Sequence, residues 1–330
     1  MAGSVKLRDI AEKMDVSIVT VSNALSGKKG VSDAMRQKII DTARDMGYDF
    51  RKKAEEGSKI GVVVSDRYLE VGASFYWSMY QEVVYAASRK NSFTLFEILE
   101  KEITPESRLP KLLLENSVDG LIVVGWMESG YMERLYNLAK VPVVLLDFHD
   151  EKIERDAVLS ESYLGMYRMT SYLLDRGHRE IGFLGSVSAT DSIMDRYFGF
   201  RKAMEERGVP IHQEWVMEDR DLRTGYVEFV LPEKLPTAFA CNCDYTAGYL
   251  YRLLGERGLR VPEDISIVGY DDYLYGNDFA EQLTTYHVDM KKMAKTAVHI
   301  LMKKIQGKEG HQGIRYVSGN VVERGSVRPL

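Results

Sequence analysis

Helical spacing of apolar residues marks three short segments near the start of the chain. The first carries the i, i+3, i+4, i+7 stripe of an amphipathic helix at Leu7, Ile10, Ala11 and Met14. After a turn over residues 15–17, the second repeats the inward spacing at Val21, Ala24 and Leu25. The third runs from a capping Ser32 to a glycine stop at Gly47, with its apolar side at Met35, Ile39, Ile40, Ala43 and Met46. These segments predict three helices around one small core, of which the first two form a helix-turn-helix.

The predicted second helix turns small and apolar side chains outward, at Ile18, Val19, Thr20, Ser22 and Asn23. A helix that faces only water is normally rich in Lys and Glu. Small and apolar groups instead suit the floor of a DNA groove, where they can reach the edges of the bases. The pattern therefore favours a DNA-binding head, although periodicity alone also fits a plain three-helix bundle that binds no nucleic acid.

Beyond residue 59 the pattern changes to continuous apolar runs separated by helical stretches. Runs typical of buried strands cover 60–65, 93–99, 119–125, 141–147, 180–185, 237–242 and 264–271. Helical patterns lie at 75–90, 109–115, 163–176, 196–206 and 245–257. Strands that are apolar throughout need helices on both faces of their sheet, which predicts an α/β body of parallel, doubly wound sheets. A charge-rich stretch at 150–155 predicts a division into two Rossmann-like lobes with a binding cleft between them.

Composition and charge narrow the class of protein. The 330 residues are 45% hydrophobic and 28% charged, which is typical of globular chains and excludes disorder or a fibrous repeat. No apolar run approaches the ~18–20 residues that cross a bilayer, and the start of the chain has no apolar signal core, so we expect a cytoplasmic protein without a membrane partner. Residues 1–59 hold 12 basic against 9 acidic residues, and residues 60–330 hold 32 against 40. A mildly basic head on an acidic body fits contact between the head and a polyanion.

The sequence contains none of the common motifs of catalysis or metal binding. Its two cysteines, Cys241 and Cys243, suit neither a disulfide framework nor a four-ligand metal site, and its six histidines are scattered. It has no G-x-S-x-G, no G-x-x-x-x-G-K-[ST] and no G-x-G-x-x-G. Asp271 and Asp272 are adjacent, so a strand would turn them to opposite sides, which is poor geometry for a carboxylate dyad. We therefore expect no enzyme, no metal and no cofactor.

Polar residues follow several of the predicted strands, at the positions where open parallel sheets bind their ligands. These positions hold Asp66, Trp126, Asp147, Ser186, residues 242–244 and the pair Asp271–Asp272. Several polar groups that meet at one sheet edge suit a polar small molecule. For Asp66, Asp244 and Asp272, capping of the following helix is the stronger alternative. The aromatic run of Phe75, Tyr76 and Trp77 opens the first helix of the body, and we expect at least one of its rings to point into the cleft.

The head resembles the DNA-binding headpiece of the lactose repressor/galactose repressor family of bacterial regulators. The likeness extends essentially throughout LRDIAEKMDVSIVTVSNALSGKKGVSDAMRQKIIDTARDMGY. It implies that Ile18, Val19 and Asn23 approach base edges in the major groove, where the asparagine can pair with adenine. It also implies phosphate contacts from the hydroxyls of Ser17, Thr20, Ser22, Ser26 and Ser32. Lys28, Lys29 and Arg36 would add non-specific attraction, or remain ordinary surface charges.

Residues 49–59, DFRKKAEEGSK, form a polar and charged linker between the head at 1–48 and the body at 60–330. In the family this stretch usually forms a hinge helix that wedges a leucine into the minor groove. In this chain the segment is a few residues shorter and contains no leucine. The resemblance therefore leaves phosphate contacts from Arg51, Lys52 and Lys53, and it does not support a central leucine wedge.

The body resembles the effector-binding core of the same family, which is related to periplasmic sugar-binding proteins. The motifs that carry this likeness are LLDRGHREIGFLG, DRYFGFRKAM and VPEDISIVGYDD. They imply that Arg196 and Asp271 clamp the hydroxyls of a ligand, with Asp147 at the lobe edge. Where the family tends to have an Asn-Asp pair this chain reads CNCD, so Asn242 and Cys243 both remain candidates.

Head and body together imply a transcriptional regulator with repression as its expected action. Two heads of a homodimer would bind the half-sites of a near-palindromic operator, because the chain ends without the helical tail that joins some relatives into tetramers. A small polar effector, first of all a sugar or sugar derivative, would bind between the lobes near Phe75–Trp77 and Trp126, and a sugar phosphate or nucleobase also suits such a cleft. The alternatives are a sugar-binding protein or a carbohydrate-acting enzyme whose helical head binds no DNA.

Overall fold

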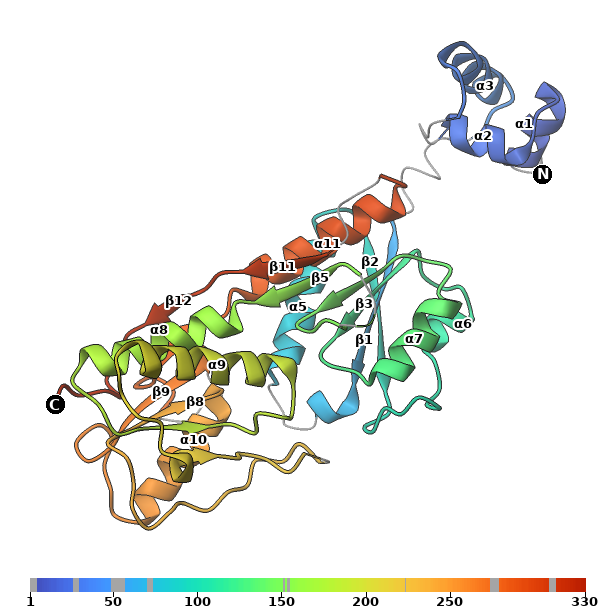
Figure 1. Ribbon diagram of the computed structural model, residues 1–330. Helices are drawn as coiled ribbons and strands as arrows, with labels where there is room; N and C mark the ends of the chain where they lie inside the picture. Colours follow the sequence, from blue (N-terminus) through green and yellow to red (C-terminus); the bar gives the residue numbers. More distant parts are fainter. Residues whose placement is uncertain are drawn as a thin grey trace. The chain divides into compact units, whose positions relative to one another are not determined.

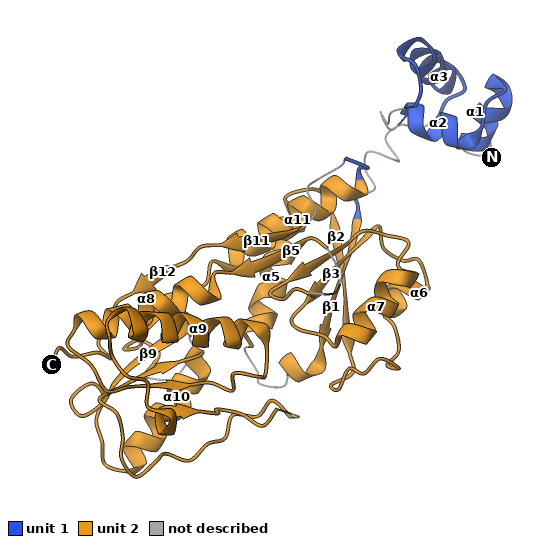
Figure 2. Cartoon of the chain, in the orientation of Figure 1, with its two compact units in different colours: residues 1–58, 306–308 blue, residues 59–305, 309–330 orange. Residues whose placement is uncertain are grey.

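The computed structural model of the chain describes residues 5–25, 30–48, 57–69, 74–150, 152, 155–222, 224–273, 279–308 and 313–330. The chain divides into two compact units, residues 1–58 with 306–308 and residues 59–305 with 309–330 (Figure 2). We call the three helices of the first unit the head and the second unit the core, and each is described by itself. The linker residues Arg51, Lys52 and Lys53 lie outside the described residues.

The head consists of α1 (Leu7–Met14), α2 (Ile18–Leu25) and α3 (Asp33–Asp45), as the apolar spacing predicts (Figure 1). Each helix contributes two buried side chains to one small core, which contains Ile10, Ala11, Val21, Ala24, Ile39 and Ala43. The residues that precede α2 and α3 act as caps, because the hydroxyls of Ser17 and Ser32 accept hydrogen bonds from backbone amides three residues later. The predicted helix-turn-helix is therefore present.

One residue expected in the head core, Met35, is exposed instead. The guanidinium of Arg36, in the same first turn of α3, reaches back to α2 and donates to the carbonyls of Asn23 and Ala24, at 3.1 and 2.8 Å. Carbonyls in the last turn of a helix lack a partner within that helix. Arg36 therefore joins α3 to the end of α2, and its side chain is not an ordinary surface charge.

The core contains two six-stranded sheets, one in each lobe. The first-lobe sheet has the order β11-β5-β4-β3-β1-β2, with β1 at Lys59–Ser65, β2 at Phe93–Leu99, β3 at Gly120–Val124, β4 at Val143–Leu146, β5 at Ala157–Ser160 and β11 at Ile314–Val317. The second-lobe sheet has the order β12-β10-β9-β8-β6-β7, with β6 at Ile181–Leu184, β7 at Val216–Met217, β8 at Ala238–Cys241, β9 at Ser266–Asp271, β10 at Thr284–His287 and β12 at Asn320–Val322. Among the described residues, β12 is the one strand that pairs antiparallel within these sheets.

Helices cover both faces of each sheet, which explains why the strands are apolar throughout. They are α5 (Phe75–Ser88), α6 (Lys111–Leu114), α7 (Ser129–Leu138), α8 (Ser162–Asp175), α9 (Asp191–Glu206), α10 (Asp244–Glu256) and α11 (Met290–Ile305), with short 3-10 turns η1 (Asp66–Tyr68) and η2 (Gln213–Trp215). Neighbouring residues of β1 enter opposite layers: Val62 packs in the cluster with Val83 of α5 and Ala297 of α11, and Val63 in the cluster with Leu135 of α7. The predicted α/β class with doubly wound sheets is confirmed.

The predicted lobe boundary at 150–155 is wrong. The chain stays in the first-lobe sheet through β5, crosses to the second lobe at α8, returns with α11, and then contributes β11 to the first sheet and β12 to the second. Asp156, which follows the charge-rich stretch, is fully buried, and its carboxylate pairs with Lys304 of α11 at 2.7 Å and Arg315 of β11 at 3.2 Å. The charged stretch therefore precedes β5. Residues far along the chain, in α11 and β11, complete this edge of the first sheet.

Within the second lobe, α8 and α9 cross at very close range. A Cβ atom on Gly199 of α9 would collide with the carbonyl oxygen of Tyr163 in α8, so only glycine allows this approach. Tyr270 and Tyr286 similarly crowd Gly165 of α8. These contacts hold α9, whose second turn carries Arg196, firmly on its lobe.

Within the described ranges, no helix has both the length and the apolar character that a bilayer crossing requires. The same residues contain no group of three or more His, Cys, Asp or Glu side chains that could hold a metal ion.

Candidate functional site

The outward face of α2 combines exposed aliphatic groups with small polar ones. The side chains of Ile18 and Val19 are 48% and 67% exposed, so two neighbouring aliphatic groups face away from the small core of the head. Thr20, Ser22 and Asn23 lie half-buried beside them on the same helix. The structure thus presents the predicted reading residues on one short helix of the head.

Some of the predicted phosphate contacts lie at helix starts, and others fall outside the described residues. Ser17 and Ser32 use their hydroxyls as helix caps, and the Ser17 hydroxyl also lies 2.8 Å from that of Thr20. Backbone amides at the starts of α2 and α3 therefore lie close to both serines, as phosphate binding at helix N-termini requires. Ser26, Lys28 and Lys29 lie outside the described residues.

A second candidate site is a hollow of about 200 Å³ between the two lobes of the core. The first lobe contributes Arg67, Tyr68, Ser74, Phe75, Tyr76 and Asp147, and the second lobe contributes Thr190, Ser192, Ile193, Arg196, Arg220, Gly225, Val227, Asn242, Cys243, Tyr245 and Asp271. Most of these residues follow strand ends or open the next helix, which is where the sheet topology predicts a ligand. We call this hollow the cleft.

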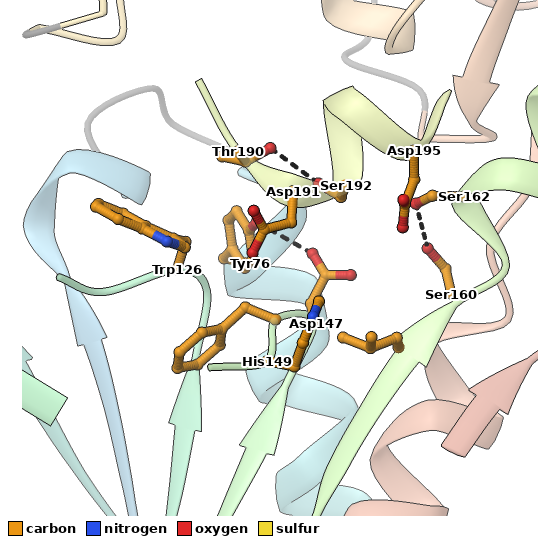
Figure 3. Close-up of a pocket in the computed structure, with 12 residues that line it drawn as sticks. Tyr76, Trp126, Asp147, His149, Ser160, Ser162, Thr190, Asp191, Ser192 and Asp195 are labelled. Atoms are coloured by element: carbon orange, nitrogen blue, oxygen red, sulfur yellow. Dashed lines mark hydrogen bonds between the residues drawn. The ribbon is translucent and has the colours of Figure 1, made fainter. Parts of the chain in front are cut away.

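Seven of the nine residues predicted for the effector site line the cleft, and Trp126 lies next to it. Trp126 lines a smaller adjoining hollow of about 20 Å³ that also includes Tyr76 and Asp147 (Figure 3). The prediction for Trp77 is wrong, because its ring is 42% exposed and packs on Tyr80 and Phe96. Successive residues of a helix point about 100° apart, so Phe75 and Tyr76 can face the cleft while Trp77 turns away from it.

On the first-lobe side of the cleft, Asp147 is held by an aromatic pair. The hydroxyl of Tyr76 donates to Oδ2 of Asp147 at 3.1 Å, and the ring of Tyr76 packs on that of Tyr68 with centroids 4.7 Å apart. Burial raises the pKa of Asp147 to about 6, against the opposing effects of the Arg196 charge and the Tyr76 hydrogen bond. The charged form of Asp147 is therefore unfavourable unless further cations or hydrogen-bond donors contact it.

On the second-lobe side, Arg196 is the central cation. Its Nη1 donates to the carbonyl of Asn242 at 2.8 Å, its Nη2 lies 3.7 Å from Oδ1 of Asp271, and its guanidinium lies 3.9 Å from the ring centroid of Tyr270. Its buried Nε has no hydrogen-bond partner in the described part of the chain. Because α9 begins at Asp191 with Thr190 as cap, Arg196 lies in the second turn and not at the helix start that the sequence predicts. A buried donor without a partner is a position that a ligand can satisfy.

Asp271 lies opposite Arg196, at the end of β9. Burial raises the pKa of Asp271 to about 7, and the positive charge of Arg196 only partly offsets this effect. The backbones of Asp147 and Asp271 have φ angles of 68° and 118°, in a region that residues with a Cβ rarely occupy. Strained backbone of this kind is concentrated at binding and catalytic sites. The neighbouring Asp272 points elsewhere, to Arg324 and His287, as the alternation along a strand predicts.

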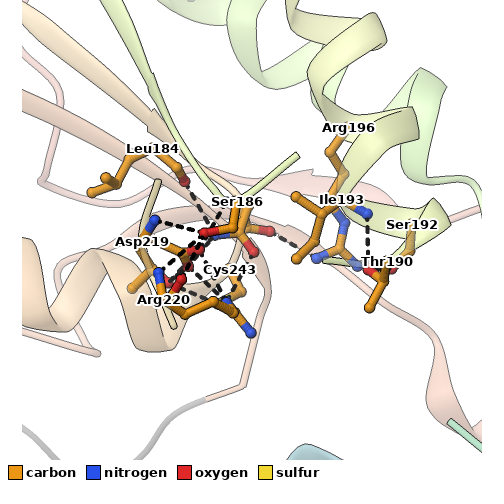
Figure 4. Close-up of polar contacts among 11 residues, drawn as sticks. Leu184, Ser186, Thr190, Ser192, Ile193, Arg196, Asp219, Arg220 and Cys243 are labelled. Atoms are coloured by element: carbon orange, nitrogen blue, oxygen red, sulfur yellow. Dashed lines mark hydrogen bonds and ion pairs between the residues drawn. The ribbon is translucent and has the colours of Figure 1, made fainter. Parts of the chain in front are cut away.

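A buried polar network organises the second-lobe wall of the cleft (Figure 4). Arg220 forms a two-pronged ion pair with Asp219, at 3.0 Å from Nε and 2.6 Å from Nη2. Burial alone would raise the pKa of Asp219, but the ion pair with Arg220 and hydrogen bonds from Thr246 and the Ser186 amide outweigh it and lower the pKa to about 2. Arg220 is therefore a permanently charged group held rigidly at the cleft.

The network includes both of the alternative residues, Asn242 and Cys243. Both residues line the cleft. The side-chain amide of Asn242 donates to the carbonyl of Leu184 at 3.1 Å and to Asp219 at 2.6 Å, so its donor hydrogens belong to the network. The thiol of Cys243 lies 3.6 Å from Nη2 of Arg220. Of the capping alternatives, Asp244 is fully committed to Thr285 and the amide of Tyr273, and it does not line the cleft.

Sequence reasoning missed several residues of the cleft. Arg67 and Tyr68 follow β1 directly, next to the one residue there, Asp66, that the sequence analysis considered. Thr190 and Ser192 lie at the start of α9, which begins five residues earlier than predicted. Arg220 follows the two-residue strand β7, which is too short to show a hydrophobic pattern, so the sequence contains no signal for it.

The two cleft carboxyl groups predict a pH dependence of stability. Because the folded state raises the pKa of Asp147 and Asp271 above the usual 3.8, it binds protons that the unfolded chain releases between about pH 4 and pH 7. The free energy of unfolding of the ligand-free protein should therefore decrease as pH rises through this window. Urea unfolding at about pH 5 and about pH 8 checks this, and Asp271→Asn should lose less stability than the wild type. An equal loss in both proteins would contradict the prediction.

Comparison with known protein families identifies two matching regions in this chain. Residues 6–49 match the family described as bacterial regulatory proteins, lacI family. Residues 170–327 match the periplasmic binding protein-like domain. The first match covers the head and the second covers most of the second lobe.

Individual relatives resemble the chain over nearly its whole length. The HTH-type transcriptional repressor PurR of Histophilus somni (strain 129Pt) is 29% identical over 340 residues, which covers 98% of this chain and 99% of the relative. Among solved structures, a lac repressor dimer bound to operator and the anti-inducer ONPF aligns with a TM-score of 0.67 at 22% identity, covering 99% of this chain and 100% of that one. A complex of the transcriptional regulator CelR with cellobiose aligns with a TM-score of 0.68 at 20% identity, covering 98% and 99%.

Proposed function

We propose that this chain is a regulator of the lacI family of bacterial regulatory proteins, and that it represses transcription under the control of a small polar molecule bound in the cleft. The observation that carries the proposal is the cleft itself. Charged groups from both lobes meet there, and the buried Nε of Arg196 has no partner among the described residues. A molecule that contacts both lobes would stabilise one arrangement of them and so change how two heads are presented to DNA.

In this proposal α2 reads the operator. Ile18 and Val19 offer only apolar contacts, which suit the methyl groups of thymine, whereas the amide of Asn23 can both donate to and accept from one adenine. The caps at Ser17 and Ser32 would set the position of the head on the phosphate backbone. The half-site is therefore expected to favour A·T pairs at the steps that face α2.

Substitution of Asn23 tests the base contact. Asn23→Ala should weaken binding to the preferred site by roughly 1–3 kcal/mol and relax the preference at one base step. Lys29→Ala is the matched comparison, since loss of a phosphate contact should weaken all sequences about equally and reduce the salt dependence. Fluorescence anisotropy at fixed salt with single-base operator variants measures both. If Asn23→Ala keeps its affinity and its preference, Asn23 does not read a base.

We further propose that the effector is a sugar or sugar derivative. Carboxylates accept hydrogen bonds from hydroxyl groups and guanidinium groups donate to them, so Asp147, Asp271 and Arg196 together suit a molecule with several hydroxyls. The aromatic rings of Phe75 and Tyr76 line the same hollow and can pack on the apolar face of a sugar ring. The cellobiose complex of the related regulator CelR supports this choice of chemistry.

The function is tested with the purified protein. DNA selected from a random library should yield a near-palindromic site, and one class of ligand among neutral sugars, sugar phosphates and nucleobases should change its affinity. Response to a neutral sugar or a sugar phosphate supports the proposal as stated, and response only to a nucleobase contradicts the sugar assignment. Turnover of a sugar without DNA binding would overturn the function altogether.

We also propose that the working form is a homodimer that uses the edge strand β2 and the adjoining flank of α5. Four large apolar side chains are exposed there, namely Trp77, Phe93, Leu95 and Ile98. An edge strand with exposed apolar residues normally requires a cover. A second copy of the chain is the fitting partner, because a near-palindromic operator needs two heads and the related lac repressor binds operator as a dimer. Sedimentation that finds a monomer at micromolar concentration would contradict this assembly.

A further inference from the structure

We propose that the groove between α5 and α11 is a second ligand site, which binds the phosphate group of a small phosphorylated molecule. The groove is a hollow of about 490 Å³ on the first lobe, and the cleft residues take no part in it. Its size falls within the range of small-molecule sites. The inference is independent of the proposed effector.

The groove concentrates positive charge on an acidic protein. Arg89 and Lys90 line it from the end of α5, and Lys291 and Lys295 line it from α11. None of the four forms an ion pair with any residue that the structure describes, whereas the chain as a whole has a net charge of -5. Glu82 is the single carboxylate in this lining, so the cations remain in excess and repel each other, and a doubly charged phosphate group would offset most of that excess.

A histidine on the same helix shows the combined effect of these charges. Lys291, Lys295, His299 and Lys303 recur at every fourth residue and so lie along one side of α11. The pKa of His299 is lowered first by burial and then by the charges of Lys303, Lys90 and Lys295. Cations from α11 and from Lys90, just beyond the end of α5, therefore both act on His299, which makes this histidine a reporter of charge near the groove.

The two helices hold the groove in a defined shape. α11 packs along α5, and the hydroxyl of Ser92, just beyond α5, lies 3.5 Å from the sulfur of Met302 (Figure 1). Side chains on rigid helices lose less freedom when they bind a ligand than side chains on loops. The amide of Lys292 is already occupied by the cap Asp289, so the cationic side chains, and not the helix terminus, would hold the anion.

The remaining wall of the groove indicates what carries the phosphate. Tyr85 is 63% exposed there and offers a ring face, Ala86 adds an apolar patch, and the carboxylate of Glu82 can accept from a hydroxyl. This combination suits a phosphorylated sugar rather than a polyanion such as DNA, which would be repelled by Glu82 and would need a stripe longer than this hollow.

The groove lies where a ligand can influence the two lobes. α11 begins three residues after β10 of the second-lobe sheet and then packs against β3, β4 and β5 of the first-lobe sheet. A ligand that joins Lys291 and Lys295 to α5 would therefore hold the segment through which the chain passes from one lobe to the other. We expect it to act as a second input on operator binding.

Histidine NMR of the full-length protein tests the site. Inorganic phosphate, compared with chloride at equal ionic strength, should raise the pKa of His299, because a bound anion offsets the lysine charges. Glucose 6-phosphate should do the same at lower concentration than phosphate, and glucose should not. No change at His299 with either phosphate compound would overturn the proposal.

Three variants test where glucose 6-phosphate binds on the protein. Arg89→Gln combined with Lys295→Gln should weaken glucose 6-phosphate at least tenfold by calorimetry, and Lys140→Gln, which removes an exposed lysine near α7, should not. Asp271→Asn should leave this binding unchanged, because the cleft is a different site. Loss of binding in Asp271→Asn but not in the double variant would assign the phosphate to the cleft and overturn the inference, without affecting the proposed function.

Discussion

Arg196→Ala is expected to remove the response to the effector while operator affinity without effector stays nearly unchanged. Arg196 lies on the second lobe of the core, and its bonds to Asn242 and Asp271 are made within the cleft. Truncation of one partner of a buried, hydrogen-bonded charge pair typically costs 2–5 kcal/mol of binding. Since about 1.4 kcal/mol corresponds to a tenfold change, effector affinity should fall by roughly thirtyfold or more.

Asp271→Asn separates charge from shape at the same position. The amide keeps the size and hydrogen-bonding capacity of the carboxylate and removes only the charge that strengthens bonds to hydroxyls. Asp272→Asn is the matched control, because Asp272 is the next residue along the chain and contacts Arg324 and His287 instead of the cleft. Titration of effector into protein bound to labelled operator measures the response of all three variants.

The outcomes of these substitutions show whether each residue recognises the effector or instead maintains the DNA-binding form of the protein. Arg196→Ala and Asp271→Asn should fold, bind operator and fail to respond, and Asp272→Asn should respond normally. If the first two variants fold and still respond, the effector binds elsewhere. If either of them loses operator binding outright, while circular dichroism shows a folded protein, the residue serves the DNA-binding state and not effector recognition.

Asp219→Ala is expected to destabilise the core by about 3–5 kcal/mol, the typical cost of breaking a buried ion pair. The carboxylate is fully buried and accepts from Arg220, Thr246, Asn242 and the amide of Ser186. Its removal leaves a largely buried guanidinium and several donors without partners. Urea unfolding measures the loss, and Asp264→Asn, at an exposed carboxylate paired with Arg260, should change the stability little.

The same carboxylate predicts an acid dependence of opposite sign to that of the cleft pair. The network lowers the pKa of Asp219 from 3.8 to about 2, so its contribution is present above about pH 4 and is lost as pH falls through about 2. The difference in unfolding free energy between wild type and Asp219→Asn should therefore shrink in acid. A difference that stays constant down to about pH 2 would mean that Asp219 stabilises the core by packing and not by its charge.

Local pattern in the sequence determined most of the head and the strand framework. Apolar spacing alone located α1, α2 and α3, and the continuous apolar runs located β1, β2, β3, β4, β6, β8 and β9 to within about two residues at each end. These elements could be predicted because each depends on its own side chains, which must bury one face or both. The rule that ligands bind at strand carboxyl ends likewise pointed to Asp147 and Asp271, whereas Arg196 came only from the family resemblance.

Elements that depend on partners far along the chain were decided only by the tertiary structure. The strand β11 pairs with β5 across more than 150 residues, and Asp156, Lys304 and Arg315 complete that edge by ion pairs that no local window contains. The lobe boundary was misplaced for this reason. The sequence contains the helical pattern of α11, and the structure buries Met293, Ala294, Ala297 and Leu301 of that pattern. The sequence does not show that α11 returns to the first lobe.

The same limit applies to side chains in the two sites. The apolar and aromatic character of Phe75, Tyr76 and Trp77 is equal in the sequence, and only the orientation of α5 turns the first two to the cleft and the third to Phe96. Arg220 became a cleft residue because Asp219, which follows β7, and Asn242 and Cys243, which follow β8, surround it. Residue type and spacing in the sequence thus determined which chemical groups the two sites could contain. Packing between distant segments decided which of these groups face one another, because such contacts depend on how whole helices and strands are placed.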